Sequence, residues 1–153
     1  MRLSLLTLFL LFTASAAWAQ PASLDYGEDF TFDDEVHHIA TVKVAPNRIE
    51  HYLAGLQQTW AVGQQIAVDM GVQHDYTIYV SEMENGGDFN VMLVSIYEDH
   101  AQRIRANDPA TATAIREAME ARMSESQLFQ TTEFYTGIRE IVGDYLVREV
   151  DFE

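Results

Sequence analysis

Cysteine is absent from this chain of 153 residues. The absence excludes disulfides, a thiol nucleophile, and zinc or iron–sulfur sites bound through cysteine. Basic residues are few: nine lysines and arginines face 24 acidic residues, and the formal charge is −15. Nucleic acids and anionic lipids require a basic surface, so this charge argues against both as partners. Motifs for a phosphate loop, a dinucleotide fold, a nucleophile elbow or a zinc protease are missing too.

Long apolar runs are also rare, and the longest stands at the start of the chain. Arg2 provides a positive charge, residues 3–12 are uncharged and mostly apolar, and residues 17–19 (AWA) have the small residues that a signal peptidase requires. The run is shorter than the roughly 20 residues that span a bilayer. We therefore predict a signal peptide over residues 1–19, a periplasmic or secreted protein, and no membrane insertion after cleavage.

The rest of the chain is expected to form one domain behind a short arm. Residues 20–35 (QPASLDYGEDFTFDDE) are acidic and show no period, so we interpret them as an N-terminal arm that docks through Tyr26, Phe30 and Phe32. Residues 36–153 have the length of one ordinary domain. Since 48% of the chain is apolar, the domain can bury a core without disulfides.

The hydrophobic pattern of residues 36–153 predicts the order β-α-β-β-α-β. Strands are expected at residues 37–44, 75–83, 89–98 and 144–152, with an Asn-Gly-Gly-Asp hairpin turn at residues 85–88. A first helix is expected from residue 49 to about residue 70, behind a capping box at residues 47–50. A second begins at Pro109 and breaks at residues 124–126, and a further helical segment ends at Gly143. This is an α+β, ferredoxin-like arrangement with an antiparallel four-stranded sheet.

The strand at residues 89–98 is apolar on both faces. Val91, Leu93 and Tyr97 point one way, while Met92 and Ile96 point the other. Helices of this topology cover one face of the sheet, and monomers rarely expose an apolar face of this size. We therefore expect a homodimer in which two sheets pack together around a shared, sheet-lined interior.

Three stretches carry a resemblance to a known group: HIATVKVAPNRIEHYLAGLQQTW at residues 38–60, MGVQHDYTIYV at residues 70–80, and REIVGDYLVREV at residues 139–150. With the strand order, they resemble the dimeric α/β-barrel superfamily. That group includes cofactor-free antibiotic-biosynthesis monooxygenases, haem-degrading monooxygenases and many barrels without assigned activity. The resemblance implies a dimeric barrel and no cofactor, with haem as the alternative. The haem-degrading branch carries an Asn, a Trp and a His in its cleft, and only Trp60 is readily matched here.

Two adjacent histidines head the first strand, in DDEVHHIATVKV at residues 33–44. Side chains alternate along a strand, so His37 and His38 face opposite ways and cannot both bind one metal ion. They are either ordinary strand residues, or one of them lines the cavity; no metal site is predicted. His74 and His100 stand beside Asp75 and Asp99, which favours loop positions but is also how a base is oriented.

The candidate ligand-binding residues are those that would line a hydrophobic cavity or hold a polar group of its ligand. Arg148 lies among apolar residues, so it needs an acidic partner or an anionic ligand group. The set is His37, His38, Trp60, Tyr76, Tyr79, Met92, Tyr97 and Arg148.

Three kinds of function remain open at this point. The first is a barrel that holds a small apolar or aromatic molecule. The second is a cofactor-free monooxygenase or isomerase, or an enzyme of the haem-degrading type. The third is an interaction module of the cell envelope that uses the acidic arm.

Overall fold

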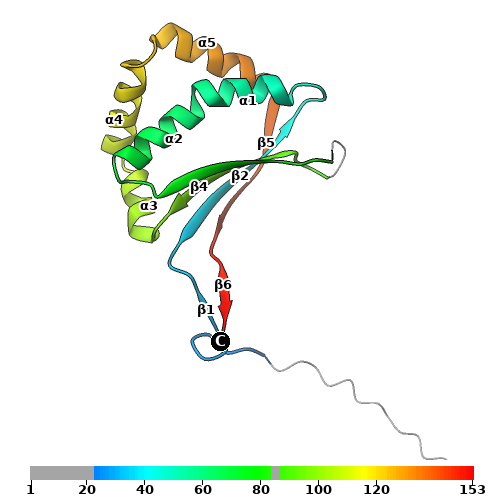
Figure 1. Cartoon of the computed structure of the whole chain (residues 1–153), viewed down its shortest axis with the longest axis vertical. Coiled ribbons are helices and arrows are strands. Elements are labelled where there is room, and N and C mark those ends of the chain that lie inside the picture. Colours follow the sequence, from blue (N-terminus) through cyan, green and yellow to red (C-terminus); the bar gives the residue numbers. More distant parts are fainter. Residues whose placement is uncertain (1–22, 84–86) are drawn as a thin grey trace, which may run out of the picture.

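The computed structural model describes residues 23–83 and 87–153. The predicted signal peptide and half of the predicted hairpin turn, residues 85 and 86, lie outside the described residues. An antiparallel four-stranded sheet forms the centre of the domain (Figure 1). Its strands are β2 (Val36–Val44), β3 (Asp75–Val80), β4 (Val91–Tyr97) and β5 (Arg139–Val147), in the order β3-β4-β2-β5. Helices connect β2 to β3 and β4 to β5, so the topology is ferredoxin-like and the predicted fold class is confirmed.

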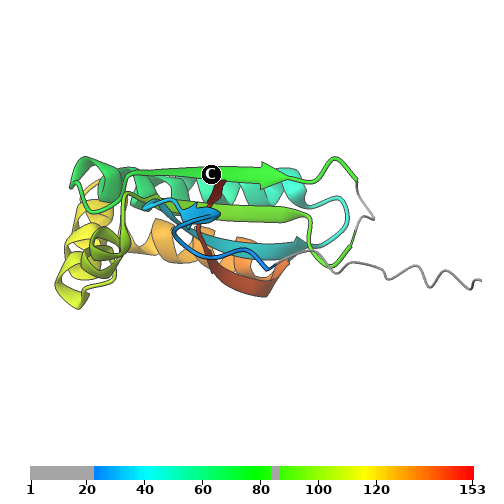
Figure 2. The ribbon, with the colours of Figure 1, turned by 90° about the horizontal axis from the view of Figure 1, so that it is seen from below.

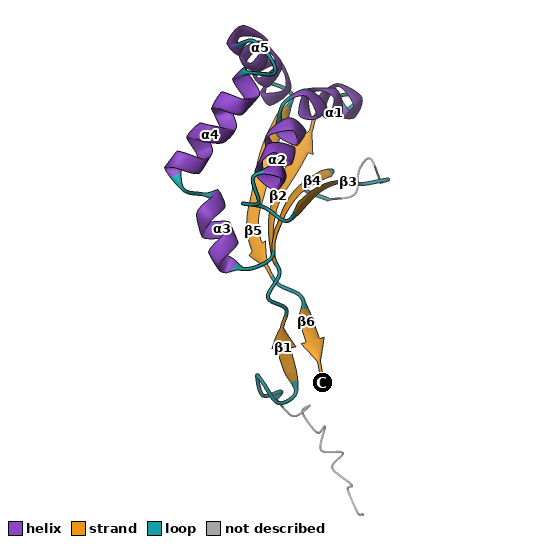
Figure 3. Cartoon of the chain, turned by 60° about the vertical axis from the view of Figure 1, so that its left-hand side comes forward, coloured by secondary structure: helices purple, strands orange, loops and turns teal. Residues whose placement is uncertain are grey.

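Two groups of helices accompany the sheet. The first connection holds α1 (Ile49–Gln58) and α2 (Trp60–Asp69), and the second holds α3 (His100–Ala106), α4 (Pro109–Glu120) and α5 (Glu125–Thr136). Helices α1 and α2 lie along the sheet, whereas α3, α4 and α5 follow one another in an arch outside them (Figures 1 and 3). We call these three helices the arch. It rests on the inner helices where α5 packs against α1 and α4 against α2.

The first helical connection differs from the expected single helix. Its chain breaks at Thr59, whose hydroxyl donates a 2.8 Å hydrogen bond to the carbonyl of Gly55. The threonine side chain thus competes with the helical backbone for its acceptors. The predicted capping box is wrong as well, because α1 begins at Ile49 without a side-chain cap. Asn47 instead has a φ of 59°, a left-handed turn position that asparagine tolerates well.

The second connection confirms two predicted boundaries and corrects a third. Asp108 caps α4 through a 2.8 Å bond from the backbone N–H of Ala110, and Ser124 forms a capping box at the start of α5. The helical segment ends at Thr136, however, and not at Gly143. Residues 139–143 belong to β5, because all of them except Val142 pair with β2. Helix α3, which Asp99 caps, was not predicted.

The core lies between β2 and β4 on one side and α1 and α5 on the other. Its buried residues are Val42, Val44, Tyr52, Leu56, Val91, Leu93 and Tyr135. Helices α1 and α5 meet closely at Gly55, where an added Cβ would stand 2.6 Å from Cδ1 of Tyr135. The rings of Tyr52 and Tyr135 pack edge to face at 5.7 Å. Arg139 covers both rings and donates a 3.3 Å hydrogen bond to the Tyr52 hydroxyl.

A two-stranded ribbon projects from one end of the sheet (Figures 1 and 3). It pairs β1 (Phe30–Phe32) with β6 (Val150–Phe152), and we call it the stem. The predicted last strand, residues 144–152, is therefore divided between the sheet and the stem. Tyr26, Phe30 and Phe32 pack on one another at ring distances of 5.7 Å. These aromatic residues of the predicted arm thus build the stem and do not dock on the helices.

Helices cover one face of the sheet and leave the other face open, and the side chains of β4 alternate between these two faces. Val91, Leu93 and Tyr97 face the helices and are buried. Met92 and Ile96 point to the opposite face, which we call the open face. Figure 2 shows the molecule from below, with the strands in front and the helices behind them. On the open face Tyr79, Tyr145 and Val147 have exposed fractions of 54%, 53% and 40%.

Candidate functional site

A cavity of about 510 Å³ lies between the sheet and the helices of the arch. The sheet contributes His38, Ser95 and Tyr97 to its wall, α2 contributes Trp60 and Gln64, and α4 and α5 close the other side. Pockets that hold drug-sized molecules span roughly 300–1,000 Å³. The expected cavity was a shared interior between two sheets, and the one described here lies instead on the helix side, within one chain.

The cavity exists because α4, the middle helix of the arch, stands away from the sheet. Helix α4 has no buried residue, so its inner side faces the cavity and does not fill it. The arch touches α2 at Gly63, where an added Cβ would lie 3.2 Å from Sδ of Met119. Ile115, Met119 and Leu128 make the wall of the arch apolar.

A hydrogen-bonded network forms one polar side of the cavity. The side-chain oxygen of Gln64 accepts from the Ser95 hydroxyl at 2.7 Å and from the Gln73 amide at 2.6 Å. Gln73 also donates to the carbonyl of Asp75 at 2.9 Å, and a carbonyl can only accept. This fixes the amide of Gln73 and, through it, that of Gln64. The NH₂ group of Gln64 has no acceptor among the described residues, so it is available to a ligand.

His38 stands at the rim of the same cavity. In the pairing of β2 with β4 it lies directly opposite Ser95. Its Nε2 hydrogen-bonds the carboxylate of Asp144 on β5. Their side chains are 37% and 68% exposed, so the pair is accessible to water. Within residues 23–83 and 87–153, Nδ1 of His38 has no hydrogen-bond partner.

Tyr97 contributes a phenol to the site, and the residue as a whole is buried, with a relative exposure of 5%. Burial raises its pKa above the ordinary value of 10.0, while the Ser95 side chain and the positive charge of Arg103 lower it by less. The hydroxyl is therefore neutral at physiological pH. A neutral phenol donates a hydrogen bond, and it does so strongly to an oxygen that gains negative charge.

The eight candidate residues from the sequence lie in three places. His38, Trp60 and Tyr97 line the cavity, and Tyr76 packs edge to face behind Trp60 at 5.6 Å. His37, Tyr79 and Met92 belong to the open face. Arg148 lies at the base of the stem. The structure thus brings three of the eight together around one cavity.

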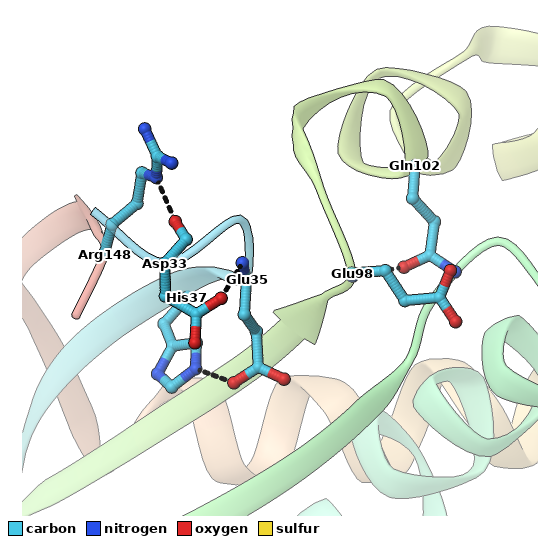
Figure 4. Close-up of polar contacts among 6 residues, drawn as sticks. All are labelled: Asp33, Glu35, His37, Glu98, Gln102 and Arg148. Carbon is cyan, nitrogen blue, oxygen red and sulfur yellow. Dashed lines mark hydrogen bonds and ion pairs between the residues drawn. The ribbon is translucent and has the colours of Figure 1, made fainter. Parts of the chain in front are cut away.

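Figure 4 shows polar contacts where the stem meets the sheet. His37 bonds Glu35 at 2.6 Å, away from the cavity. Arg148 donates to the carbonyls of Asp33 and Phe32 at 2.6 and 3.1 Å. Its expected acidic partner is Asp34, at 3.8 Å. Arg148 therefore ties β1 to the end of β5.

The other histidines have separate partners. Nδ1 of His74 lies 3.6 Å from the carboxylate of Glu98, and His100 begins α3, which Asp99 caps. Across the described part of the chain, no three histidine, aspartate or glutamate side chains converge as metal ligands. In that same part, no helix is long and apolar enough to cross a membrane.

Asp144, Gln64 and Gln73 were not among the sequence candidates. Asp144 was missed because the residues before it were assigned to a helix. The side of the sheet to which its side chain points could therefore not be predicted. One signal was present: an acidic residue inside the apolar run IVGDYLV requires a partner if that run forms a strand. The two glutamines left no signal in the sequence, because isolated glutamines in or near helices are common.

No family model matches the chain, and no curated protein matches it. Solved structures that are similar include a dimeric, ferredoxin-like protein of unknown function from Bacteroides fragilis, with 13% identity, a TM-score of 0.41, and 80% and 99% of the two chains covered. A NIPSNAP-like domain protein from Burkholderia xenovorans has 13% identity, a TM-score of 0.42, and 79% and 86% coverage.

SnoaB, a cofactor-independent oxygenase from Streptomyces nogalater, is similar at 12% identity and a TM-score of 0.38, with 78% and 93% of the chains covered. These similarities are remote. The ferredoxin-like fold of this chain follows from its own strand order, and its activity must be argued from its own cavity.

Proposed function

We propose that this protein binds a small, largely apolar molecule in the cavity between the sheet and the arch. The observation that carries the proposal is the pairing of an apolar wall with a few converging polar groups. Trp60 and Met119 offer apolar contact, while the amide of Gln64 and the hydroxyl of Tyr97 offer donors. Sites for small organic molecules have this composition.

The chemistry of the wall narrows the class of ligand. Two of the polar groups that line the cavity, the Gln64 amide and the Tyr97 hydroxyl, can donate hydrogen bonds, which favours a ligand with an oxygen acceptor such as a carbonyl. A neutral ligand is favoured, because the chain carries a formal charge of −15 and would repel anions at long range. Aromatic or alicyclic carbonyl compounds meet both conditions. The proposal needs no cofactor.

The test is displacement of Nile red, a neutral dye, together with native mass spectrometry of the protein purified from its host. Leu128→Trp would fill the cavity from α5, whereas Phe129→Trp adds the same ring at an adjacent position that is 61% exposed. We expect Leu128→Trp to abolish binding and Phe129→Trp to retain it. Equal binding by both variants, or an empty wild-type protein that takes up no dye, would contradict the proposal.

We also propose that two copies pair through their open faces. The apolar, exposed side chains of Tyr79, Tyr145 and Val147 support this. Among the described strands, β5 stands at the edge of the sheet with nine residues, and natural proteins usually cover or pair such an edge. A symmetric pair would bury the same patch twice, and a stable interface needs more than about 1,000 Å². Light scattering should give twice the mass of the mature chain.

The location outside the cytoplasm remains a proposal. It is supported by the charged start, the apolar run and the AWA sequence at residues 17–19. N-terminal sequencing of exported protein should begin at Gln20. An intact N-terminus in the exported fraction would contradict cleavage at this site.

A further inference from the structure

We propose that the cavity is a proton-transfer site, in which His38, held by Asp144, removes a proton from the carbon next to a carbonyl group of the bound molecule. The inference rests on the ligand-binding function proposed above. It assigns a reaction to the pair of side chains at the cavity rim, and it assigns a substrate class: neutral, largely apolar ketones with an acidic C–H bond.

The pairing of β2 with β5 makes the contact between the two residues. His38 lies opposite Leu146, and Ala40 lies opposite Asp144. Residues directly opposite each other share a face, so Asp144 points to the same side of the sheet as His38. The two are diagonal neighbours, at a spacing that longer side chains cross. Their hydrogen bond joins positions 106 residues apart in the chain.

The carboxylate determines which nitrogen of His38 can act as a base. An ionised Asp144 only accepts hydrogen bonds, so Nε2 of His38 carries the hydrogen. Nδ1 of the neutral ring is then unprotonated, and it has no partner in the described part of the chain. When Nδ1 takes a proton, the nearby carboxylate stabilises the imidazolium that forms.

Besides a base, the reaction requires a hydrogen-bond donor to the carbonyl oxygen of the ketone. Tyr97 and Gln64 supply one each, and both line the cavity with His38. As the C–H bond breaks, negative charge moves to the carbonyl oxygen, and preplaced donors stabilise this charge more than they stabilise the neutral ketone. The phenol of Tyr97 stays protonated through this step because burial raises its pKa.

The step balances without any further reagent. The C–H bond breaks, its electron pair forms the C=C bond of an enolate, and the proton moves to Nδ1 of His38. Return of the proton to another carbon of a conjugated enolate shifts the double bond, and the product is an isomer. Return to the same carbon regenerates the ketone. In both cases the base is restored and nothing is oxidised or reduced.

The neighbouring His37 provides a matched control. It also hydrogen-bonds a carboxylate, that of Glu35 at 2.6 Å, but on the open face and away from the cavity. His37→Asn therefore removes an equivalent histidine–carboxylate pair one position along the same strand. Any effect confined to His38→Asn depends on the cavity and not on the loss of a surface histidine.

The probe is beta-tetralone, a neutral bicyclic aromatic ketone, whose exchange of α-hydrogens in heavy water is followed by proton NMR. Wild-type protein should accelerate exchange with saturation kinetics. His38→Asn should lower kcat by at least about 100-fold, and added imidazole should restore part of it. His37→Asn should leave the rate unchanged. Asp144 acts through His38 as a positioning residue, so Asp144→Asn should lower kcat by roughly 10-fold or more with KM unchanged.

Binding of beta-tetralone, measured by calorimetry, separates the two proposals. A wild-type protein that binds the ketone but does not accelerate exchange would overturn the proton-transfer site and leave ligand binding intact. The same holds if His38→Asn folds, binds and exchanges at the wild-type rate. Failure of the wild-type protein to bind the ketone would overturn the assigned substrate class and, with it, the inference.

Discussion

Arg139 and Asp144 point to the same face of β5, although an odd number of positions separates them. In a regular strand such residues face opposite ways. The pairing explains the exception: Thr41 lies opposite Gly143 and Val42 opposite Ile141, which leaves Val142 without a partner. This bulge lets Arg139 reach the core at Tyr52 and Asp144 reach His38 at the cavity. Because of this one inserted residue, the same face of β5 contacts both the core and the candidate site.

The pair of His38 and Asp144 should matter little for stability. Both side chains are substantially exposed, at 37% and 68%, and exposed ion pairs contribute about 0–1 kcal/mol. We expect His38→Ala, His38→Asn and Asp144→Asn each to lower the free energy of unfolding by about 1 kcal/mol or less. Urea unfolding measures this. A loss near 4 kcal/mol would show a structural role and would weaken the case for catalysis.

Gly55 should not tolerate even alanine. The added Cβ would stand 2.6 Å from the ring of Tyr135, which is itself held in the core. We expect Gly55→Ala to destabilise the protein by about 1–3 kcal/mol, the usual range for overpacking. Gly137→Ala is the control, because its Cβ would meet only backbone oxygens at 3.6 Å. Thermal unfolding of the two variants should differ clearly, and equal midpoints would contradict the close contact of α1 and α5.

A charge on the open face should separate the two copies of the proposed dimer. Met92→Asp lies on that face, whereas Leu93→Asp places a carboxylate in the core. We expect Met92→Asp to give a folded monomer or a poorly soluble chain, and Leu93→Asp to damage the fold itself, since a charge is buried without a partner. Circular dichroism and light scattering distinguish these results. A wild-type protein that is monomeric at micromolar concentration would remove the dimer proposal.

Stability should fall at alkaline pH. Burial raises the pKa of both Tyr52 and Tyr97 above 10.0. The positive charges of Arg139 near Tyr52 and of Arg103 near Tyr97 oppose this rise only partly. Below about pH 10 the tyrosines are protonated in both states. Above it the unfolded chain loses these protons first, so it binds fewer protons than the folded chain and stability decreases as pH rises. Urea midpoints from about pH 9 to about pH 11 should show the fall, and Tyr97→Phe should reduce it.

Local patterns were enough to predict most of the fold. Alternation in residues 37–44 identified β2, a short run that is apolar on both faces at residues 89–98 identified β4, and Asp108-Pro109 marked the start of α4. These signals depend only on residues that are close together in the chain, so they can be recognised from the sequence alone. The predicted faces of β4 were also right, because alternation alone decides them.

The sequence-based predictions were wrong where a stretch could form a helix but another interaction favoured a different structure. Residues 139–143 follow a helix and continue its apolar spacing, yet they pair with β2 as a strand. The helical pattern continues past Thr59, yet the hydroxyl of Thr59 bonds the carbonyl of Gly55 and the helix breaks at Thr59. Tertiary pairing resolved the first case and a side-chain hydrogen bond the second, and periodicity records neither.

The sequence by itself determined which side chains of one strand share a face, and His38, Trp60 and Tyr97 were among its eight candidates for a ligand site. Only the tertiary structure decided what meets them. Asp144 reaches His38 through a strand pairing and a bulge that join distant segments, and Gln64 is oriented by Gln73 and Ser95 from other elements. The cavity itself exists because α4, in the middle of the arch, stands away from the sheet. Alternation is set by the geometry of one strand, whereas register, bulge and helix spacing depend on packing between segments far apart in the chain.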